Sequence, residues 1–191
     1  MKILVLGDDK VGKTALISKF LGSDKPWEYS PTIEELYTFN TDCVKHEIYE
    51  VTLDLLVYPT YFEQCSAFLI VFDVTVLSSF CLVKSIIERI WAFEPRVKKI
   101  YIFGTNADQK ESRLVSKKQG KLLALRYDCV YMEGSTDTGK NVTKMFNQIV
   151  KDVVDKPTIS KSQRYSTVNL SFLSKPKRSL KTSVSLKNVF K

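Results

Sequence analysis

The feature that most constrains this chain is the segment GDDKVGKT at residues 7–14, which matches the pattern GxxxxGK[ST] in full. It directly follows the apolar run at residues 3–6 and directly precedes a helical pattern over residues 14–21. In that position the glycines let the backbone wrap around a phosphate group, while loop N–H groups and the helix N-terminus supply partial positive charge. The order of strand, glycine loop and helix therefore predicts a phosphate-binding loop.

Two side chains of this loop have their own chemistry. Lys13 is placed to reach the outer phosphates of a nucleotide, and the Thr14 hydroxyl is placed to ligate Mg²⁺. A chance match in an ordinary strand-to-helix turn is the alternative, and the matching flanks argue against it. The pattern predicts phosphate binding and leaves the base open. We expect contacts to the nucleotide from Gly7, Asp8, Asp9, Lys10, Val11, Gly12, Lys13, Thr14 and Ala15.

Apolar runs and helical patterns alternate along the chain. Runs at residues 3–6, 67–72 and 100–103 have the composition of strands that are buried on both faces. Helical patterns cover residues 14–21, 80–93, 116–127 and 142–154, the third of which opens with a Ser-Lys-Lys-Gln capping box. Strands that alternate with helices predict a mostly parallel sheet with helices on both faces.

Two weaker strand patterns, at residues 36–40 and 47–53, are separated by turn-like residues 41–45. They predict an antiparallel hairpin at one edge of the sheet. The fold class that we expect is thus α/β, with a mixed but mostly parallel sheet of six strands.

The charge of the chain is distributed unevenly. The net charge is +8, but residues 1–155 carry −1 from 20 basic and 21 acidic residues, whereas residues 156–191 contain 9 basic residues and no acidic one. We therefore expect one domain over residues 1–155 and a basic tail over residues 156–191 that is disordered when free. Because the basicity belongs to the tail, we expect no specific binding of nucleic acid by the domain.

The cysteines do not indicate a metal site. Four cysteines show no CxxC spacing, and the chain contains a single histidine. No charged segment followed by an apolar segment marks secretion at the N-terminus. Free thiols in a reducing cytosol or nucleus are the expectation.

Residues 29–35, YSPTIEE, resemble the effector loop of the Ras subfamily of small GTPases. The resemblance implies that Tyr29 contacts the nucleotide and that Thr32 completes the Mg²⁺ shell and touches the γ-phosphate. It also implies that Asp54, at the end of the next strand, holds the metal through water. The expected metal residues are thus Thr14, Thr32 and Asp54.

Two further segments resemble the base-binding motifs of this family. Residues 105–108, TNAD, match [NT]KxD except that Asn106 replaces the lysine, and Asp108 would accept from two guanine N–H donors. Residues 133–142, EGSTDTGKNV, are similar to ExSAKxGxNV, with Asp137 in place of the second lysine. The resemblance extends over residues 2–154 and implies a P-loop NTPase G domain. The base-binding residues that it implies are Thr105, Asn106, Asp108, Ser135 and Thr136, and a turn or helix cap remains the alternative for Asp108.

The catalytic motif of this family, DxxGQ, stands here as DLLVY at residues 54–58. Val57 replaces the pivoting glycine, and Tyr58 replaces the glutamine that orients water. Asp9 and Lys10 occupy loop positions that are both glycine in Ras proper. We expect very slow GTP hydrolysis, no intact catalytic residue beyond the phosphate electrostatics of Lys13, and the loss of most of the second switch helix.

The tail contains no cysteine, and residue 2 is lysine, so we expect neither prenylation nor N-myristoylation. Residues 175–178, KPKR, fit a nuclear-import patch or a contact with an anionic membrane, and a solvated tail is the third reading. We expect a monomer in the cytoplasm, with nuclear or peripheral membrane association left open.

These patterns are compatible with two functions. The first is a Ras-like switch that binds GTP or GDP with Mg²⁺ and presents residues 29–35 to effector proteins, with impaired hydrolysis. The second is a pseudo-GTPase scaffold that acts without nucleotide. An ATP-using P-loop enzyme is disfavoured because Asp108 and residues 133–142 suit guanine.

Overall fold

A computed structural model of the chain describes residues 1–23, 33–41, 44–53, 59–94 and 99–154. These residues belong to one unit, Met1–Lys156, and the second unit, Pro157–Lys191, lies outside them. The expected domain boundary and the character of the tail therefore stay predictions. The strands are β1 (Lys2–Gly7), β2 (Glu34–Thr41), β3 (Val44–Val51), β4 (Ala67–Asp73), β5 (Lys99–Thr105) and β6 (Val130–Glu133). The helices are α1 (Lys13–Leu21), α2 (Pro59–Gln64), α3 (Leu77–Phe93), α4 (Lys117–Arg126) and α5 (Val142–Val154).

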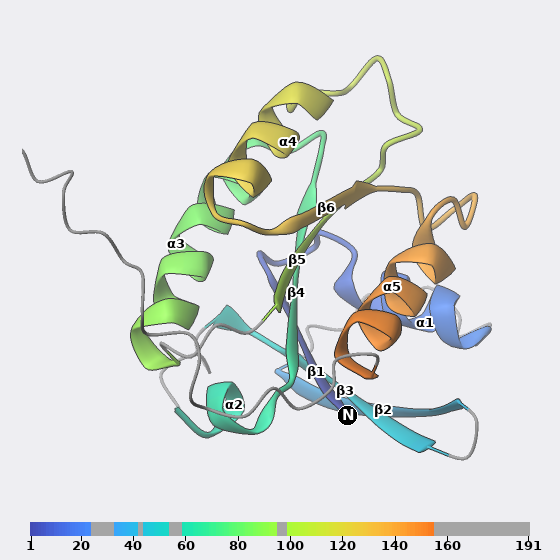
Figure 1. The fold of residues 1–191 in the computed structure, drawn as a ribbon. Coiled ribbons are helices and arrows are strands. Elements are labelled where there is room, and N and C mark those ends of the chain that lie inside the picture. The colour runs from blue at the N-terminus through green and yellow to red at the C-terminus, as the bar shows by residue number, and fades with distance from the viewer. Residues whose placement is uncertain (24–32, 42–43, 54–58, 95–98, 155–191) are drawn as a thin grey trace, which may run out of the picture. The chain divides into compact units, whose positions relative to one another are not determined.

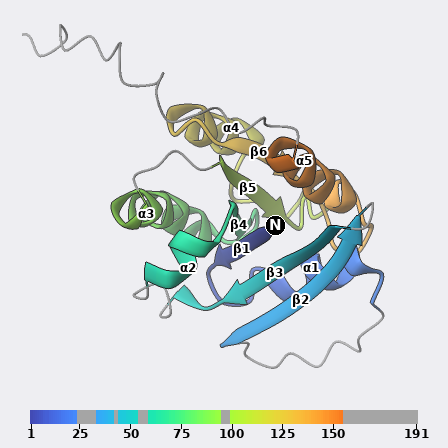
Figure 2. The same cartoon turned by 60° about the horizontal axis from the view of Figure 1, so that its bottom comes forward.

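The six strands form one sheet in the order β2-β3-β1-β4-β5-β6 (Figure 1). All neighbours are parallel except β2 and β3, which form the antiparallel hairpin at one edge. Helices α1 and α5 lie on one face of the sheet, and α3 and α4 lie on the other (Figures 1 and 2). The expected α/β class, with six strands and helices on both faces, is confirmed.

The alternation of side chains along β1 explains why both faces are covered. Ile3 and Val5 point into the core formed with α1 and α5, whereas Leu4 and Leu6 point into the core formed with α3. Every residue of β4 is buried. A strand with two apolar faces needs helices on both sides, so the central strands dictate the three-layer arrangement.

Several boundaries differ from the sequence expectation. The hairpin strands are longer at the turn, since Thr41 pairs with Val44, and β3 ends at Val51 instead of residue 53. Helix α3 begins at Leu77, three residues before the predicted start. The sequence patterns located neither β6, which is four residues long and half-buried, nor α2. Both are too short to show a period.

Helix α2 is held by aromatic packing. Its Phe62 is fully buried and stacks on Phe93 at the end of α3, with the ring centroids 5.0 Å apart. The capping box predicted for α4 is confirmed, because Ser116 Oγ accepts from the Gln119 backbone N–H and the Gln119 side chain accepts from the Ser116 N–H. Within the described ranges, each helix is too short or too polar to cross a bilayer.

His46 is fully buried at the start of β3. Its Nε2 hydrogen-bonds with Thr41 Oγ1, and its ring lies 4.9 Å from that of Phe39. Among the described residues, its buried Nδ1 has no hydrogen-bond partner. Burial lowers the pKa of this imidazole, and the nearby N-terminal ammonium lowers it further.

We therefore expect stability to fall in mild acid through His46. Because its folded pKa lies below its unfolded value, the unfolded chain binds the extra proton, and stability is lost as pH falls below about 6.5. His46→Gln keeps a polar partner for Thr41 and does not titrate. Thermal unfolding between pH 7.5 and 5.5 should show a melting temperature that drops by a few degrees more in the wild type than in this variant. Equal drops would show that His46 does not govern the acid response.

Candidate nucleotide-binding site

The phosphate loop links β1 to α1 through three residues with positive φ. These are Gly7 at 151°, Lys10 at 59° and Gly12 at 89°. A Cβ at position 7 would lie 2.2 Å from the carbonyl oxygen of Val71 on β4, so only glycine fits there. Helix α1 then starts with the Leu16 N–H bonded to Gly12 O. The loop thus curls tightly around the N-terminus of α1, as the sequence predicted.

The Lys13 side chain closes this loop from within. Its Nζ donates to Gly7 O at 3.1 Å and to Asp8 O at 2.9 Å, and the residue is only 7% exposed. Burial lowers the pKa of this ammonium, against the opposing charges of Glu50, Asp9 and Asp8. An ammonium has three N–H donors, so it can hold both carbonyls and still donate to an anion in the loop. A bound phosphate would supply the negative charge that favours the protonated form.

Thr14 meets a carboxylate that the sequence reasoning missed. Its Oγ1 donates to Glu50 Oε1 at 2.7 Å, and Glu50 is 1% exposed. The other oxygen, Glu50 Oε2, accepts from the Tyr37 hydroxyl of β2 at 3.2 Å. Burial raises the pKa of Glu50, while the Thr14 hydrogen bond and the Lys13 charge counteract that rise. Because the Thr14 proton points at Glu50, the lone pairs of its oxygen remain available to a cation.

A signal for Glu50 was present in the sequence. His46, Ile48 and Glu50 alternate on the inward face of β3 and are all buried. An acidic residue in phase with buried positions of a strand indicates a carboxylate with a specific partner. The resemblance to the family motif assigned the metal carboxylate to Asp54 instead.

The remaining expected switch residues, Tyr29, Thr32 and Asp54, lie outside the described residues. Strand β3 ends at Val51, three residues before Asp54. Among the described residues, the carboxylate that lies against Thr14 is Glu50.

The donor set at Thr14 fits Mg²⁺. A hydroxyl and a carboxylate are the hard oxygen donors that this ion prefers, and Mg²⁺ in nucleotide sites takes few protein ligands because phosphates and water supply the rest. Within the described parts of the chain, no group of three or more His, Cys, Asp or Glu could hold a metal alone. Thr14 would ligate the ion directly, and Glu50 would orient the Thr14 hydroxyl.

Thr105, the last residue of β5, connects the phosphate loop to the other side of the site. Its Oγ1 lies 2.8 Å from Val11 O in the loop and 3.1 Å from Phe72 O in β4, and the residue is 1% exposed. A single hydroxyl proton is shared between these two carbonyls. The hydroxyl therefore ties the loop to the carboxyl ends of two strands.

Asn106 follows with a positive φ of 57°, a conformation that asparagine adopts more readily than lysine. Its Nδ2 donates to Asp73 Oδ2 at 2.7 Å, and Asp73 Oδ1 accepts from the backbone N–H of Thr75 at 2.8 Å. The Asn106 side chain is thus engaged with the end of β4. Asp108, two residues further on, is exposed. Its carboxylate is accessible to a ligand.

The second base loop lies beside the first. The Ala107 N–H donates to Gly134 O at 2.9 Å, and a Cβ at position 134 would lie 2.1 Å from Lys140 O. Ser135 and Thr136 follow and are buried, and Ser135 Oγ accepts from the Thr138 N–H at 3.2 Å. The structure therefore brings Thr136 and Asp108 into neighbouring loops.

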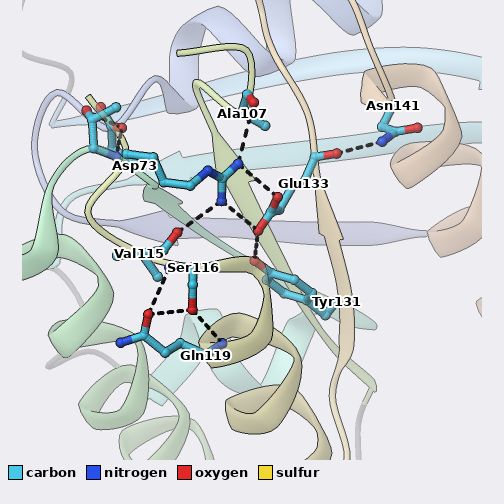
Figure 3. A network of polar contacts seen from close by, with 10 residues as sticks. Asp73, Ala107, Val115, Ser116, Gln119, Tyr131, Glu133 and Asn141 are labelled. Carbon is cyan, nitrogen blue, oxygen red and sulfur yellow. Dashed lines mark hydrogen bonds and ion pairs between the residues drawn. The ribbon is translucent and has the colours of Figure 1, made fainter. Parts of the chain in front are cut away.

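A partly buried ion pair braces these two loops. Arg113 donates to both carboxylate oxygens of Glu133, at 3.2 and 3.1 Å, and to Val115 O at 3.0 Å. The Glu133 carboxylate also accepts a hydrogen bond from the Tyr131 hydroxyl (Figure 3). The backbone carbonyl of Glu133 accepts a hydrogen bond from the Asn141 amide at 2.6 Å. No local pattern indicates this pair, because its members are 20 residues apart. The ion pair fixes the spacing between the loops.

The phosphate loop and the loops after β5 and β6 lie at the carboxyl edge of the parallel strands, which is the usual ligand-binding edge of such sheets. This edge of the sheet has the features of a P-loop nucleotide-binding protein. They are a buried lysine in a glycine loop, a hydroxyl beside a carboxylate, and two braced loops with an accessible aspartate.

Comparison with known proteins assigns the family. Residues 2–155 match the model of the Ras family, so the chain belongs to that family of small GTPases. It is 31% identical over 163 residues to the human Ras-related and estrogen-regulated growth inhibitor, covering 80% of this chain and 81% of that protein. It is 28% identical over 165 residues to the Ras-like protein rasU of Dictyostelium discoideum, covering 81% and 76%. The GTP-binding protein Rheb homolog of the same organism is 27% identical over 164 residues, covering 80% and 86%.

We predict that Glu50 sets the Mg²⁺ requirement of nucleotide binding. Glu50→Gln keeps the size of the side chain and removes the charge that orients Thr14, so the Mg²⁺ concentration for half-maximal nucleotide retention should rise about tenfold or more. Glu47→Gln is the matched control, because Glu47 lies on the same strand and pairs with Lys2 instead. Release of a fluorescent guanine nucleotide at graded Mg²⁺ measures both. Identical requirements in the two variants would remove Glu50 from the metal site.

Proposed function

We propose that this chain is a guanine-nucleotide switch that binds GTP and GDP with Mg²⁺, hydrolyses GTP very slowly and presents residues 29–35 to effector proteins. The observation that carries the proposal is the Thr105 hydrogen bond to Val11 O. It joins the loop that holds Lys13 and Thr14 to the loop that holds Asp108. Groups suited to phosphate, metal and base thus belong to one connected site.

Guanine is favoured by the chemistry of Asp108. An exposed carboxylate accepts two hydrogen bonds, and the guanine edge offers two neighbouring N–H donors. The neighbouring Thr136 would add a backbone N–H donor for the guanine carbonyl. Adenine offers a different pattern on the same edge. The site thus supports GTP over ATP.

Slow hydrolysis is supported by the sequence at two places. Residues 54–58 contain no glutamine to orient water, and they lie outside the described residues. Asp9 and Lys10 are exposed at the rim of the phosphate loop, at positions where Ras proper has glycine. Side chains there crowd the space through which a water-orienting group or an arginine from an activating protein approaches the γ-phosphate.

The second candidate, a scaffold that works without nucleotide, is favoured by one observation. Three polar side chains of the site already have partners within the protein, because Lys13 bonds loop carbonyls, Thr14 bonds Glu50 and Asn106 bonds Asp73. A site that satisfies its own polar groups can persist without a ligand.

The other parts of the proposal rest on the sequence alone. The chain would act as a monomer in the cytoplasm, and the basic tail would contact an anionic membrane or the nuclear-import machinery. Effector proteins would bind residues 29–35, in the manner general to Ras-like GTPases.

The nucleotide content of the purified chain tests this proposal. We expect freshly purified full chain, once denatured and chromatographed, to release stoichiometric GTP, because binding is intact and turnover is very slow. Lys13→Ala removes the buried ammonium and should be recovered nearly empty. Released GDP would show that some hydrolysis or exchange persists, and it would keep the switch. An empty wild-type chain that also fails to bind added guanine nucleotide with Mg²⁺ would favour the scaffold.

A further inference from the structure

Helix α4 presents an unusual surface outside the nucleotide site. Its ten residues, KKQGKLLALR, contain four cations and no acidic residue. The rest of the described domain does not share this bias, since residues 1–155 carry a net charge of −1. Helix α4 thus carries a local charge of +4 in a domain whose total charge is −1.

The rotation of α4 about its axis is fixed by close packing on β6. Gly120 is buried, and a Cβ there would lie 2.1 Å from the Tyr131 hydroxyl oxygen, so the helix approaches Tyr131 as closely as a glycine allows. Ala124, one turn later, is buried beside it. The opposite side of the helix therefore faces solvent. We call it the α4 face, and its residues are Lys117, Lys118, Lys121, Leu122, Leu125 and Arg126.

Two leucines lie within this cationic face. Leu122 is 54% exposed and Leu125 is 79% exposed. Single exposed leucines are common, but two that are neighbours on one helix and flanked by cations form an amphipathic arrangement. Both apolar side chains project from the convex surface of the helix.

Aromatic side chains extend the α4 face toward α3. Trp91 is 43% exposed, and its ring lies 5.5 Å from that of Tyr127, which follows α4. The Arg126 guanidinium lies over the Tyr127 ring at 5.9 Å. Helices α3 and α4 lie side by side on this face of the sheet (Figure 1). Tryptophan and tyrosine favour the boundary between water and an apolar phase.

We propose that the α4 face docks onto an anionic lipid membrane. The cations of the α4 face favour a negatively charged partner. The exposed leucines favour a partner into which apolar side chains of a convex surface can insert. A bilayer with anionic headgroups offers both, because the cations stay among the headgroups while the leucines enter the acyl boundary. A nucleic acid offers negative charge but no such boundary. This contact is separate from the basic tail and from the nucleotide site.

Sedimentation of the full chain with vesicles tests the proposal. The probes are phosphatidylcholine vesicles with about 30% phosphatidylserine and, for comparison, pure phosphatidylcholine vesicles. The triple variant Lys118→Gln, Lys121→Gln, Arg126→Gln lowers the net charge from +8 to +5. Each cation at the membrane strengthens partitioning about fivefold, so the loss of three cations should weaken it on the order of a hundredfold.

The matched control removes the same charge from the other face of the sheet. Lys19, Lys144 and Lys151 are exposed on α1 and α5, and their triple change to glutamine also gives +5. We expect this control to lose less than about tenfold, because charges remote from the membrane are screened. Equal losses in the two triple variants, or no binding of the wild type to anionic vesicles, would overturn the proposal.

A second variant tests the leucines. Leu122→Ser with Leu125→Ser leaves the charge unchanged, and we expect about tenfold weaker partitioning. Leu77→Ser with Val154→Ser changes exposed apolar residues elsewhere and should bind as the wild type does. Full binding by the Leu122 and Leu125 variant would overturn insertion of the α4 face. If soluble polyglutamate, but not the vesicles, binds the chain with the same dependence on the α4 face, the partner is an acidic protein and the membrane proposal fails.

Discussion

The nucleotide site depends on one buried charge, the ammonium of Lys13. Its pKa is lowered because burial costs the charged form more than the nearby carboxylates return. The carbonyls of Gly7 and Asp8 that surround it are dipoles and carry no net charge. The loop is therefore built around a cation that is only partly compensated, and this is the electrostatic condition in which a bound anion contributes most.

Other residues of the site hold the loop around Lys13 in place. Glu50 supplies the nearest buried carboxylate and holds Thr14, and Thr105 fixes the loop against the ends of β4 and β5. Asn106 uses its amide to hold Asp73, where relatives have a lysine. The substitution thus exchanges a long cationic side chain for a short polar one that fits the positive φ at this position.

Much of the fold and of the site could be predicted from the sequence. Where the prediction failed, the failure has a physical reason. The buried strands and the glycine loop are local patterns, so the fold class and the turn between β1 and α1 were predictable. Helix α2 and β6 are shorter than the period that would reveal them, and the packing of Phe62 on Phe93 that holds α2 is a tertiary contact. Glu50 was missed because the metal carboxylate was assigned to Asp54 from the family motif, although the inward phase of Glu50 with His46 and Ile48 was visible. Arg113 was missed because its role exists only when two distant segments meet.

The pairing of Arg113 with Glu133 has a consequence for the motions of the site. One guanidinium holds the Glu133 side chain and the Val115 carbonyl, and the Ala107 N–H holds Gly134 O. Neither base loop can separate from the other without breaking the bidentate Arg113–Glu133 ion pair and leaving the Glu133 carboxylate without its cation, which is costly. In hydrogen exchange the two loops should therefore behave as one cooperative unit, with amides in both opening together. A ligand that engages either loop would then slow exchange in both, so the base-binding half of the site responds as a single body.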